Sequence, residues 1–216
     1  MEDSFKARGL RRQLVKVLIQ KGINNPKVID AIGKVPRHFF LDNAFIQHAY
    51  QDKAFPIGEG QTISQPYTVA FQSQLLDPKM DDKILEIGTG SGYQACVLVE
   101  MGVTLFSMEY NKVLYDKTRK KLPTMGYRPI LKNGDGSLGW PIHAPFDGII
   151  VTAGAPIVPD ALKEQLKIGG KLVIPVGDNT TQKMLLITRM SEVEFETKEY
   201  DNFSFVPLLG KQGWKK

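Results

Sequence analysis

The fold of this chain is decided by the stretch Lys83-Ile84-Leu85-Glu86-Ile87-Gly88-Thr89-Gly90-Ser91-Gly92-Tyr93-Gln94-Ala95. A short apolar run ends there in a glycine-rich turn, and a segment compatible with a helix, 95–101, follows it. Strand, tight loop and helix in this order are typical of the first unit of a nucleotide-binding α/β domain. The sequence therefore predicts such a domain, with a ligand site at the loop.

The three glycines of the loop have separate predicted roles. Gly88 and Gly90 allow a sharp turn with positive φ, and Gly92 allows the following helix to lie close to the strand. The loop would then offer bare N–H groups and a helix N-terminus to a polar ligand. Tyr93 stands where a dinucleotide fingerprint has its last glycine, so the loop favours a group smaller than a pyrophosphate. Alone, the motif leaves open a methyltransferase loop or another tight strand–helix turn.

A second strand, predicted at 103–108, ends at an acidic residue. Glu109 follows this strand, and Asn111 can cap the next helix. A carboxylate at this place can accept two O–H hydrogen bonds from a ribose diol. The alternative is a solvated residue near a helix N-terminus, where negative charge is favourable. Together with the glycine loop, Glu109 favours ribose binding.

The remaining α/β pattern predicts more of the same sheet. Asp135 follows the third predicted strand, 128–132. The preference of aspartate for turns is by itself enough to explain this residue. Its place is also where open α/β sheets bind ligands, and its carboxylate could accept a bond from an adenine amino group. The other predicted elements are strands at 128–132, 145–155 and 171–176, helices at 111–125 and 159–166, and an antiparallel pair at 184–190 and 192–199.

The N-terminal part, 1–78, reads as helical. One helix is expected to end at Gly22 and bury Leu10, Leu14, Val17 and Leu18; a second begins at Pro26 and a third covers 66–76. The residues between the last two, 41–65, look irregular, and so long a loop is usually functional. Without further evidence, the hydroxyl groups of Thr62 and Ser64 are explained by hydrogen bonds within a turn or at a helix N-cap. No linker is visible, so a single domain, 1–216, is expected, with the α/β core and C-terminal strands at 79–216.

Composition excludes several classes of protein. The chain has 216 residues, 42% of them hydrophobic, and a net charge of +5, which argues against disorder. Basic clusters at 6–12 and 117–121 are interpreted as solvated helix faces and not as a nucleic-acid patch. His38, His48 and His143 show no metal-ligand spacing, so no metal is expected.

The single cysteine, Cys96, is expected to be a buried small hydrophobe. It allows no disulfide within the chain, the first residues are unlike a signal peptide, and no apolar run approaches membrane length. The sequence therefore predicts a cytoplasmic protein without a membrane partner.

Taken together, the motifs closely resemble those of the protein-L-isoaspartate (D-aspartate) O-methyltransferase family, over nearly the whole chain. The most specific are Gln61-Thr62-Ile63-Ser64-Gln65-Pro66 and Phe205-Val206-Pro207-Leu208, whereas the glycine loop marks methyltransferases generally. The other matching stretches are Val35-Pro36-Arg37, Gly134-Asp135-Gly136, Gly139-Trp140, Ala144-Pro145-Phe146-Asp147 and Gly169-Gly170-Lys171-Leu172-Val173-Ile174-Pro175-Val176-Gly177.

The resemblance implies a Rossmann-like sheet with an added N-terminal helical part and antiparallel C-terminal strands. It implies that S-adenosylmethionine donates a methyl group to the free carboxylate of L-isoaspartyl residues, and in some members D-aspartyl residues, in damaged proteins and peptides. The ester then collapses to a succinimide, which starts repair. Substrate proteins and peptides are the implied partners, without nucleic acid, and nothing in the sequence demands more than a monomer.

The resemblance also assigns residues by position. Ser64 takes the place of the active-site serine, and Phe205, Val206, Pro207 and Leu208 would hold the substrate peptide through their backbone. The residues implied for the donor are Thr62, Ile63, Gln65, Glu86, Gly88, Thr89, Gly90, Ser91, Gly92, Glu109, Tyr110, Asp135 and Gly136.

The implied chemistry suits so sparse a set of side chains. The nucleophile is the substrate's own carboxylate, which is ionised at pH 7, so no general base is required. Charge cancels toward the transition state when this carboxylate attacks a methyl on a positive sulfonium, so a water-poor pocket helps. Positioning is then the main task. Ser64 is expected to orient the carboxylate as a hydrogen-bond donor and not to act as a nucleophile.

Two other interpretations remain open from sequence. The glycine loop, Glu109 and Asp135 specify only the donor, so another carboxylate or a small molecule is an alternative acceptor. A binding module that keeps the fold without catalysis is the second. The chain also departs from the family pattern at Ala153-Gly154-Ala155, where an Ala-Ala or Ala-Cys pair is expected, and at Gly210-Lys211-Gln212.

Overall fold

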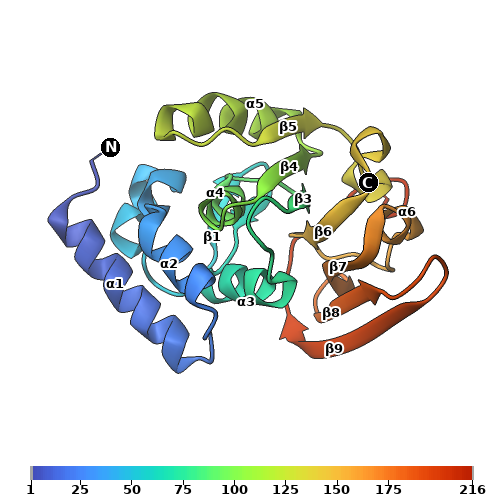
Figure 1. The fold of residues 1–216 in the computed structure, drawn as a ribbon. Helices are drawn as coiled ribbons and strands as arrows, with labels where there is room; N and C mark the ends of the chain where they lie inside the picture. Colours follow the sequence, from blue (N-terminus) through green and yellow to red (C-terminus); the bar gives the residue numbers. More distant parts are fainter. Residues whose placement is uncertain (1, 216) are drawn as a thin grey trace.

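The computed structural model describes residues 2–215 and is built around one sheet (Figure 1). Its seven strands lie in the order β5-β4-β3-β6-β7-β8-β9. Neighbours from β5 to β7 are parallel, and β8 and β9 are antiparallel. The strands are β3 (Lys83–Ile87), β4 (Thr104–Glu109), β5 (Ile130–Asn133), β6 (Phe146–Val151), β7 (Leu166–Gly177), β8 (Gln182–Arg189) and β9 (Phe195–Phe203). The expected α/β class with antiparallel C-terminal strands is confirmed.

The central strands are buried on both faces, which explains their continuous apolar sequence. Within β3, Ile84 packs into one hydrophobic core, whereas Leu85 and Ile87 pack into a second core across the sheet. In β6, Ile150 packs into the first of these cores and Ile149 into the second. Each central strand therefore supplies both layers of the interior.

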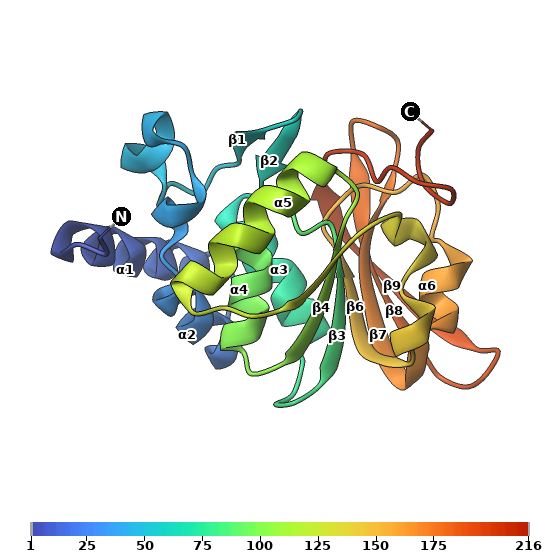
Figure 2. The ribbon, with the colours of Figure 1, turned by 90° about the horizontal axis from the view of Figure 1, so that it is seen from above.

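Helices cover the two faces unequally (Figure 2). The first face is covered by α3 (Pro66–Leu76), α4 (Tyr93–Glu100), α5 (Lys112–Lys121) and the 3₁₀ turn Leu122–Met125. The second face is covered by α6 (Asp160–Glu164), with the 3₁₀ turns Gly136–Leu138 and Pro141–His143 nearby in sequence. Asn111 caps α5, as predicted, by accepting from the N–H groups of Val113 and Leu114.

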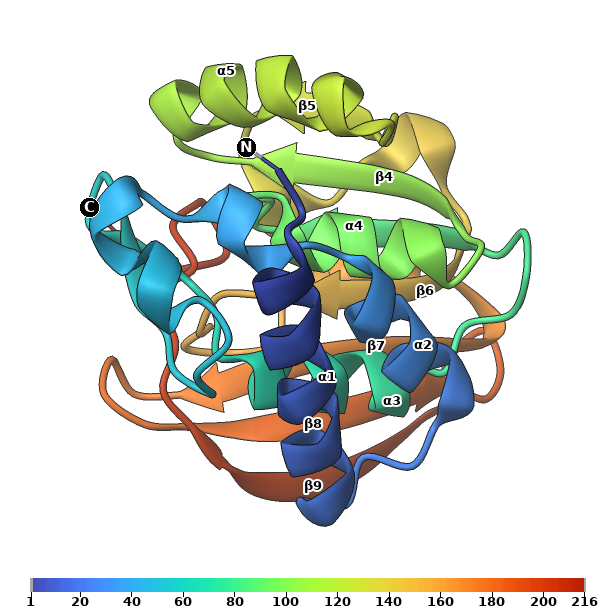
Figure 3. The same ribbon diagram turned by 90° about the vertical axis from the view of Figure 1, so that its left-hand side faces the viewer.

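The N-terminal part adds an outer layer over α3 and α4 (Figure 3). It consists of α1 (Phe5–Gln20) and α2 (Pro26–Lys34), whose first turns are capped by Ser4 and Asn25. Leu14 and Leu18 are buried as predicted, but Val17 is 38% exposed. The buried stripe of α1 is therefore narrower than the sequence pattern indicated, because the helix packs on one side only.

The segment 41–65 is more regular than predicted. After the 3₁₀ turns Arg37–Phe40 and Asn43–His48 it forms an antiparallel hairpin of β1 (Phe55–Gly58) and β2 (Gln61–Ile63). Strands of four and three residues are too short to show a clear two-residue alternation. The glycines at 58 and 60, read as loop punctuation, mark the turn of this hairpin.

Two C-terminal boundaries also differ from the prediction. The helix predicted at 159–166 is only the short α6, and Gly169-Gly170 lie within the long strand β7 because Leu166 already pairs with Phe146 of β6. The last strand begins later than predicted, since a turn occupies 190–194. The first difference comes from pairing with β6, and the second from the turn that joins β8 to β9.

The carboxyl ends of β3, β4 and β6 meet at one edge of the sheet. Chain order reverses there, because β4 and β5 lie on one side of β3 and β6 on the other. Open α/β sheets bind ligands at such a switch point.

Candidate active site

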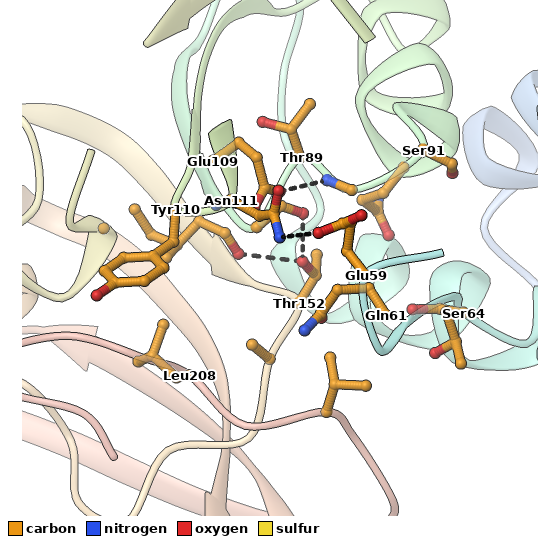
Figure 4. Close-up of a pocket in the computed structure, with 18 of the residues that line it drawn as sticks. Glu59, Gln61, Ser64, Thr89, Ser91, Glu109, Tyr110, Asn111, Thr152 and Leu208 are labelled. Carbon is orange, nitrogen blue, oxygen red and sulfur yellow. Dashed lines mark hydrogen bonds between the residues drawn. The ribbon is translucent and has the colours of Figure 1, made fainter. Parts of the chain in front are cut away.

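A cavity of about 420 Å³ opens at this edge of the sheet (Figure 4). Its walls come from the β1–β2 hairpin, the loop after β3, the end of β4 and the segment 206–209. Thirteen of the residues predicted for the site line it: Thr62, Ile63, Ser64, Gly88, Thr89, Gly90, Ser91, Glu109, Tyr110, Gly136, Val206, Pro207 and Leu208.

The N–H groups of the glycine loop form more hydrogen bonds within the protein than the sequence indicated. The N–H groups of Gly88 and Thr89 donate to the Met108 carbonyl at 2.8 and 3.2 Å. The Gly90 N–H donates to Glu109 Oε2 at 2.7 Å. The expectation of a row of bare N–H groups is therefore wrong for these residues. Their bonds instead fix the loop against the end of β4.

Glu109 is the charged group best placed to bind a ligand in the cavity. Besides the Gly90 contact, its Oε1 accepts from the Asn111 N–H at 2.8 Å. Each carboxylate oxygen thus keeps a free lone pair, and two backbone donors hold the plane of the group. Burial raises the pKa of Glu109, while these N–H bonds act in the opposite direction. The arrangement can accept two hydroxyl groups from one ligand.

Glu86, by contrast, does not line the cavity. Its side chain is fully buried, and its Oε2 accepts from Ser107 Oγ at 2.5 Å. Ser107 Oγ lies 2.6 Å from Thr89 Oγ1, so Glu86 reaches the glycine loop only through two hydroxyl groups. Burial raises its pKa to about 8, which keeps it neutral at pH 7. A neutral, enclosed group is unsuited to the direct donor contact expected of Glu86.

Ser64 lies in the short gap between β2 and α3, and it faces the same cavity as Glu109 and Leu208 (Figure 4). Its neighbour Gln65 is turned away, since Gln65 Nε2 donates to Asp52 at 3.0 Å and is absent from the cavity wall. The structure therefore brings the predicted serine to the cavity but not the following glutamine.

The segment 206–208 is attached by an isolated parallel β-bridge, Gly154 to Pro207, to the stretch that follows β6. The Gly154 N–H donates to the Val206 carbonyl and the Leu208 N–H donates to the Gly154 carbonyl, both at 2.8 Å. A Cβ on Gly154 would lie 2.7 Å from Gln182 Cδ, and Gln182 Oε1 accepts from the Phe205 N–H. This close approach explains why a glycine stands where the family pattern has alanine.

Phe205 itself is outside the cavity wall and packs beside Phe203. Gly92 is also outside it and lies against Leu122. Both residues therefore support the site from behind.

Asp135 holds the C-terminal segment. Its Oδ2 accepts from the Lys211 N–H at 2.8 Å, and its Oδ1 accepts from the N–H and Oγ of Ser137. Ser137 Oγ also accepts from the Gln212 N–H at 3.0 Å. The neighbouring Gly136 lines the cavity, but Asp135 does not.

Sequence reasoning missed several wall residues. Glu59 lies at the tip of the hairpin, and its Oε2 accepts from Asn111 Nδ2 at 3.3 Å. Thr152 follows β6 and donates to the Gly88 carbonyl at 2.6 Å. Glu59 belongs to the stretch read as irregular, and Thr152 to a strand read only as buried. The pattern Gly58-Glu59-Gly60 was the one local signal, since a polar residue between glycines is typical of a tight turn.

The cavity suits a reaction in which the substrate brings its own nucleophile. None of its wall residues is a histidine or a cysteine, and Cys96 is buried as predicted. Among residues 2–215 no group of three or more His, Cys, Asp or Glu could hold a metal ion. A search of the same residues finds no helix long and apolar enough to span a membrane.

Comparison with protein families gives one match over most of the chain. A model described as "Protein-L-isoaspartate(D-aspartate) O-methyltransferase (PCMT)" matches residues 9–213. The protein-L-isoaspartate O-methyltransferase of Cytophaga hutchinsonii is 59% identical over 99% of this chain and 97% of its own. The protein of the same name from Flavobacterium psychrophilum is 59% identical over 97% of this chain and 98% of its own.

Solved structures agree with this comparison. A protein-L-isoaspartate O-methyltransferase that is 26% identical superposes with a TM-score of 0.85 over 94% of this chain and 67% of its own. A second structure, described as a putative enzyme of this kind from Plasmodium falciparum in complex with S-adenosyl-L-homocysteine, is 23% identical. It superposes with a TM-score of 0.78 over 92% of this chain and 98% of its own, and shows the shared fold.

Proposed function

This chain belongs to the protein-L-isoaspartate (D-aspartate) O-methyltransferase family and uses S-adenosylmethionine to methylate L-isoaspartyl residues in proteins, and we propose that its cavity is the site of that transfer. The observation that carries the assignment is the meeting of three separate stretches in one cavity. Ser64, Glu109 and the segment 206–208 lie far apart in sequence but line the same space.

The donor half of the cavity is formed by the glycine loop and the end of β4. We assign the ribose of the donor to Glu109, because each of its carboxylate oxygens keeps a free lone pair. Tyr110 and Gly136 line the wall on either side and support an adenine position there. S-adenosylmethionine supplies a methyl group on a positively charged sulfur. The carboxylates of Glu59 and Glu109 lie in this half of the wall with one cation, Lys112, which is paired with Asp116, and the resulting negative charge suits a cationic donor.

The substrate half is formed by Ser64 and the C-terminal segment. We assign to the Ser64 hydroxyl the task of orienting the isoaspartyl carboxylate, whose oxygen attacks the methyl carbon. Val206, Pro207 and Leu208 would hold the peptide backbone, since this segment is extended and fixed to Gly154 by a parallel β-bridge. Phe205 and Gln65 support the two sides from outside the wall. No proton has to move in this reaction, so a cavity wall without histidine is sufficient for it.

The remaining assignments concern positioning. We propose that Thr62, Ile63, Thr89, Ser91 and the loop glycines shape the donor half through packing and backbone contacts. Glu86 would act on Thr89 through Ser107, and Asp135 would act through the C-terminal segment and through Gly136.

We further propose that the protein works as a monomer of one domain in the cytoplasm, on isoaspartyl proteins and peptides, without nucleic acid or membrane. The single cysteine, Cys96, is free, and a chain without a disulfide supports a reducing setting. Activity on D-aspartyl residues is part of this proposal, because the family's description includes it.

Analysis of the product tests the assignment of the acceptor. An isoaspartyl peptide should gain one methyl group, detected by mass spectrometry, and then lose methanol at mildly alkaline pH to give the succinimide. A panel of small carboxylic acids serves as the competitor set for the alternative function. Methylation of a small acid, with the isoaspartyl peptide unmodified, would contradict the assignment.

A further inference from the structure

Helix α3 begins directly after Ser64, yet its own N-cap residue does not cap it. Gln65 occupies the N-cap position and makes no capping bond to the helix, and Pro66 has no N–H to satisfy. The first backbone donor of the helix is therefore the N–H of Tyr67. Unsatisfied donors of this kind are the normal reason that helix starts require a cap.

Asp52, which lies in the turn before the hairpin, supplies this cap from a distance. Its Oδ1 accepts from the Tyr67 N–H at 2.8 Å, and its Oδ2 accepts from Gln65 Nε2 at 3.0 Å. Lys21 Nζ donates to the same Oδ2 at 2.6 Å, and the Asp52 side chain is only 10% exposed. One enclosed carboxylate therefore binds both the first and the third residue after Ser64.

The residue before Ser64 is fixed as well. Ile63 is 2% exposed in the hydrophobic core and pairs with Phe55 across the hairpin. Ser64 therefore lies between a strand end that is held by packing and a helix start that is held by Asp52. Asp52 therefore restrains the helix start on one side of Ser64, as core packing restrains Ile63 on the other.

The turn that carries Asp52 is itself held by a buried cation. Arg37 Nε donates to the Ala49 carbonyl at 3.0 Å, and Arg37 Nη2 donates to the Lys53 carbonyl at 3.1 Å. Arg37 is fully buried, and its guanidinium carbon lies 4.8 Å from the ring centre of Tyr93, which lines the donor side of the cavity. Burial lowers its pKa to about 10, so it remains charged at pH 7. Arg37 thus connects the helix after the glycine loop to the turn behind the serine.

We propose that Asp52 is a positioning residue for methyl transfer: its carboxylate caps α3 and thereby holds the Ser64 hydroxyl at the reacting carboxylate. Arg37 fixes the turn from which Asp52 acts. This inference rests on the role assigned to Ser64. It also gives a role to the Val35-Pro36-Arg37 motif, which lies outside the cavity wall.

Two substitutions at Asp52 test the proposal in the full-length protein. Asp52→Ala should lower kcat on an isoaspartyl peptide by about ten- to a hundredfold, because small displacements of a positioning group are costly. Its S-adenosylmethionine Kd should stay within about twofold of the parent, because Asp52 is not in the cavity wall. Hydrogen exchange at the Tyr67 amide should become faster. Asp52→Asn retains an oxygen that can accept from the Tyr67 N–H and should lose less activity than Asp52→Ala. It therefore tests the same role if the alanine variant fails to fold.

The matched control is Lys21→Met, which removes the ammonium that pairs with Asp52 and lies 5.5 Å from the Tyr67 ring centre, leaves the cap itself in place, and should keep the parental kcat. An Asp52→Ala protein with parental kcat and faster Tyr67 exchange would overturn the proposal. So would an equal loss in Lys21→Met, because the ion pair would then be responsible instead of the cap. A parent protein that fails to methylate the isoaspartyl peptide would contradict the assigned function instead, and the exchange rate at Tyr67 would still decide whether Asp52 caps the helix.

Discussion

At the scale of single residues, the site depends on hydroxyl and carboxylate groups whose surroundings decide what they can do. Glu86 lies within β3 and Glu109 ends the neighbouring strand β4, and both are nearly inaccessible to solvent. Only Glu109 has two backbone N–H donors that stabilise its charged form at the cavity. The two glutamates therefore have different roles, which their sequence positions alone do not separate.

The Ser64 hydroxyl is expected to matter for turnover and not for donor binding. Ser64→Ala should lower kcat by about tenfold or more, because the isoaspartyl carboxylate loses one directed hydrogen bond in the transition state. The S-adenosylmethionine Kd, measured by calorimetry, should change by less than about twofold. Thr197→Ala, on the exposed edge strand β9, is the control. Parental kcat in Ser64→Ala would remove Ser64 from the mechanism.

The ribose assignment predicts a loss of donor affinity in Glu109→Ala. Loss of an acceptor for two hydroxyl groups should cost about 1.5–3 kcal/mol, or roughly ten- to a hundredfold in Kd. Exposed Glu164→Ala is the matched control, since it removes a carboxylate far from the cavity wall. If Glu109→Ala binds S-adenosylmethionine as the parent does, another residue holds the ribose.

Glu86 gives a pH dependence whose sign follows from its burial. Its pKa is raised to about 8 in the folded protein, against an ordinary value of about 4.3. Between these values the folded chain retains a proton that the unfolded chain has lost, so the contribution of Glu86 to the free energy of unfolding falls as pH rises. Glu86→Gln cannot ionise and should gain stability relative to the parent between pH 5 and pH 8. Thermal unfolding at both pH values measures this, and an identical difference at pH 5 and pH 8 would show that Glu86 is ionised in the fold.

At the scale of elements, Gly92 joins the loop to α4 in a way that no other residue permits. Its φ is +86°, and a Cβ would lie 2.8 Å from Leu122 and 2.9 Å from Thr118. The sequence predicted a close approach to the strand, but the close neighbours belong to α5 and the turn after it. Gly92→Ala should therefore reduce the free energy of unfolding by about 1–3 kcal/mol.

Gly9→Ala is the matched control for this substitution. Gly9 lies within α1 and has no atom within 4 Å of its ideal Cβ position. Alanine is the better helix former there and should stabilise the protein by about 0.4–1 kcal/mol. Denaturant titration of both variants measures the contrast. Equal effects of the two substitutions would mean that the left-handed backbone and close packing at Gly92 carry no cost.

The C-terminal segment is expected to be held in place by Ser137 and Trp214. Ser137 Oγ accepts from the Gln212 N–H, and Trp214 Nε1 donates to the Gly154 carbonyl at 3.0 Å. Ser137→Ala and Trp214→Phe each remove one of these bonds and should raise the peptide KM by about three- to tenfold, with a smaller change in donor Kd. Steady-state kinetics with one isoaspartyl peptide measures this. A larger change in donor Kd than in peptide KM would show that the bonds serve the donor half instead.

The sequence predicted the parallel core well, because strands buried on both faces have long apolar runs and their helices have clear caps such as Asn111. It predicted less where strands are very short or where a strand's start is set by its partner. The hairpin around Glu59 has strands of four and three residues, and the start of β7 depends on Phe146. Glu59 was missed because these strands are too short to show an alternating pattern, and Thr152 was missed because its place in the wall follows from tertiary contacts.

At the scale of the whole molecule, the sheet brings together one cavity from stretches that span most of the chain. The family resemblance, applied residue by residue, predicted thirteen of its wall residues, whereas Gln65, Glu86, Gly92, Asp135 and Phe205 lie behind the wall. These five occupy motif positions too, but motif membership does not distinguish a ligand contact from the support of one. Burial and hydrogen bonding make that distinction.

The most direct test of the account uses two peptides that differ only in aspartate or isoaspartate at one position. Each is incubated with the protein and methyl-labelled S-adenosylmethionine, and base-labile methyl ester is counted. The account predicts label on the isoaspartyl peptide alone, and a strong decrease of that label with Ser64→Ala. Label on neither peptide, with donor binding intact, or equal label on both, would contradict the assignment of this cavity to isoaspartyl methyl transfer.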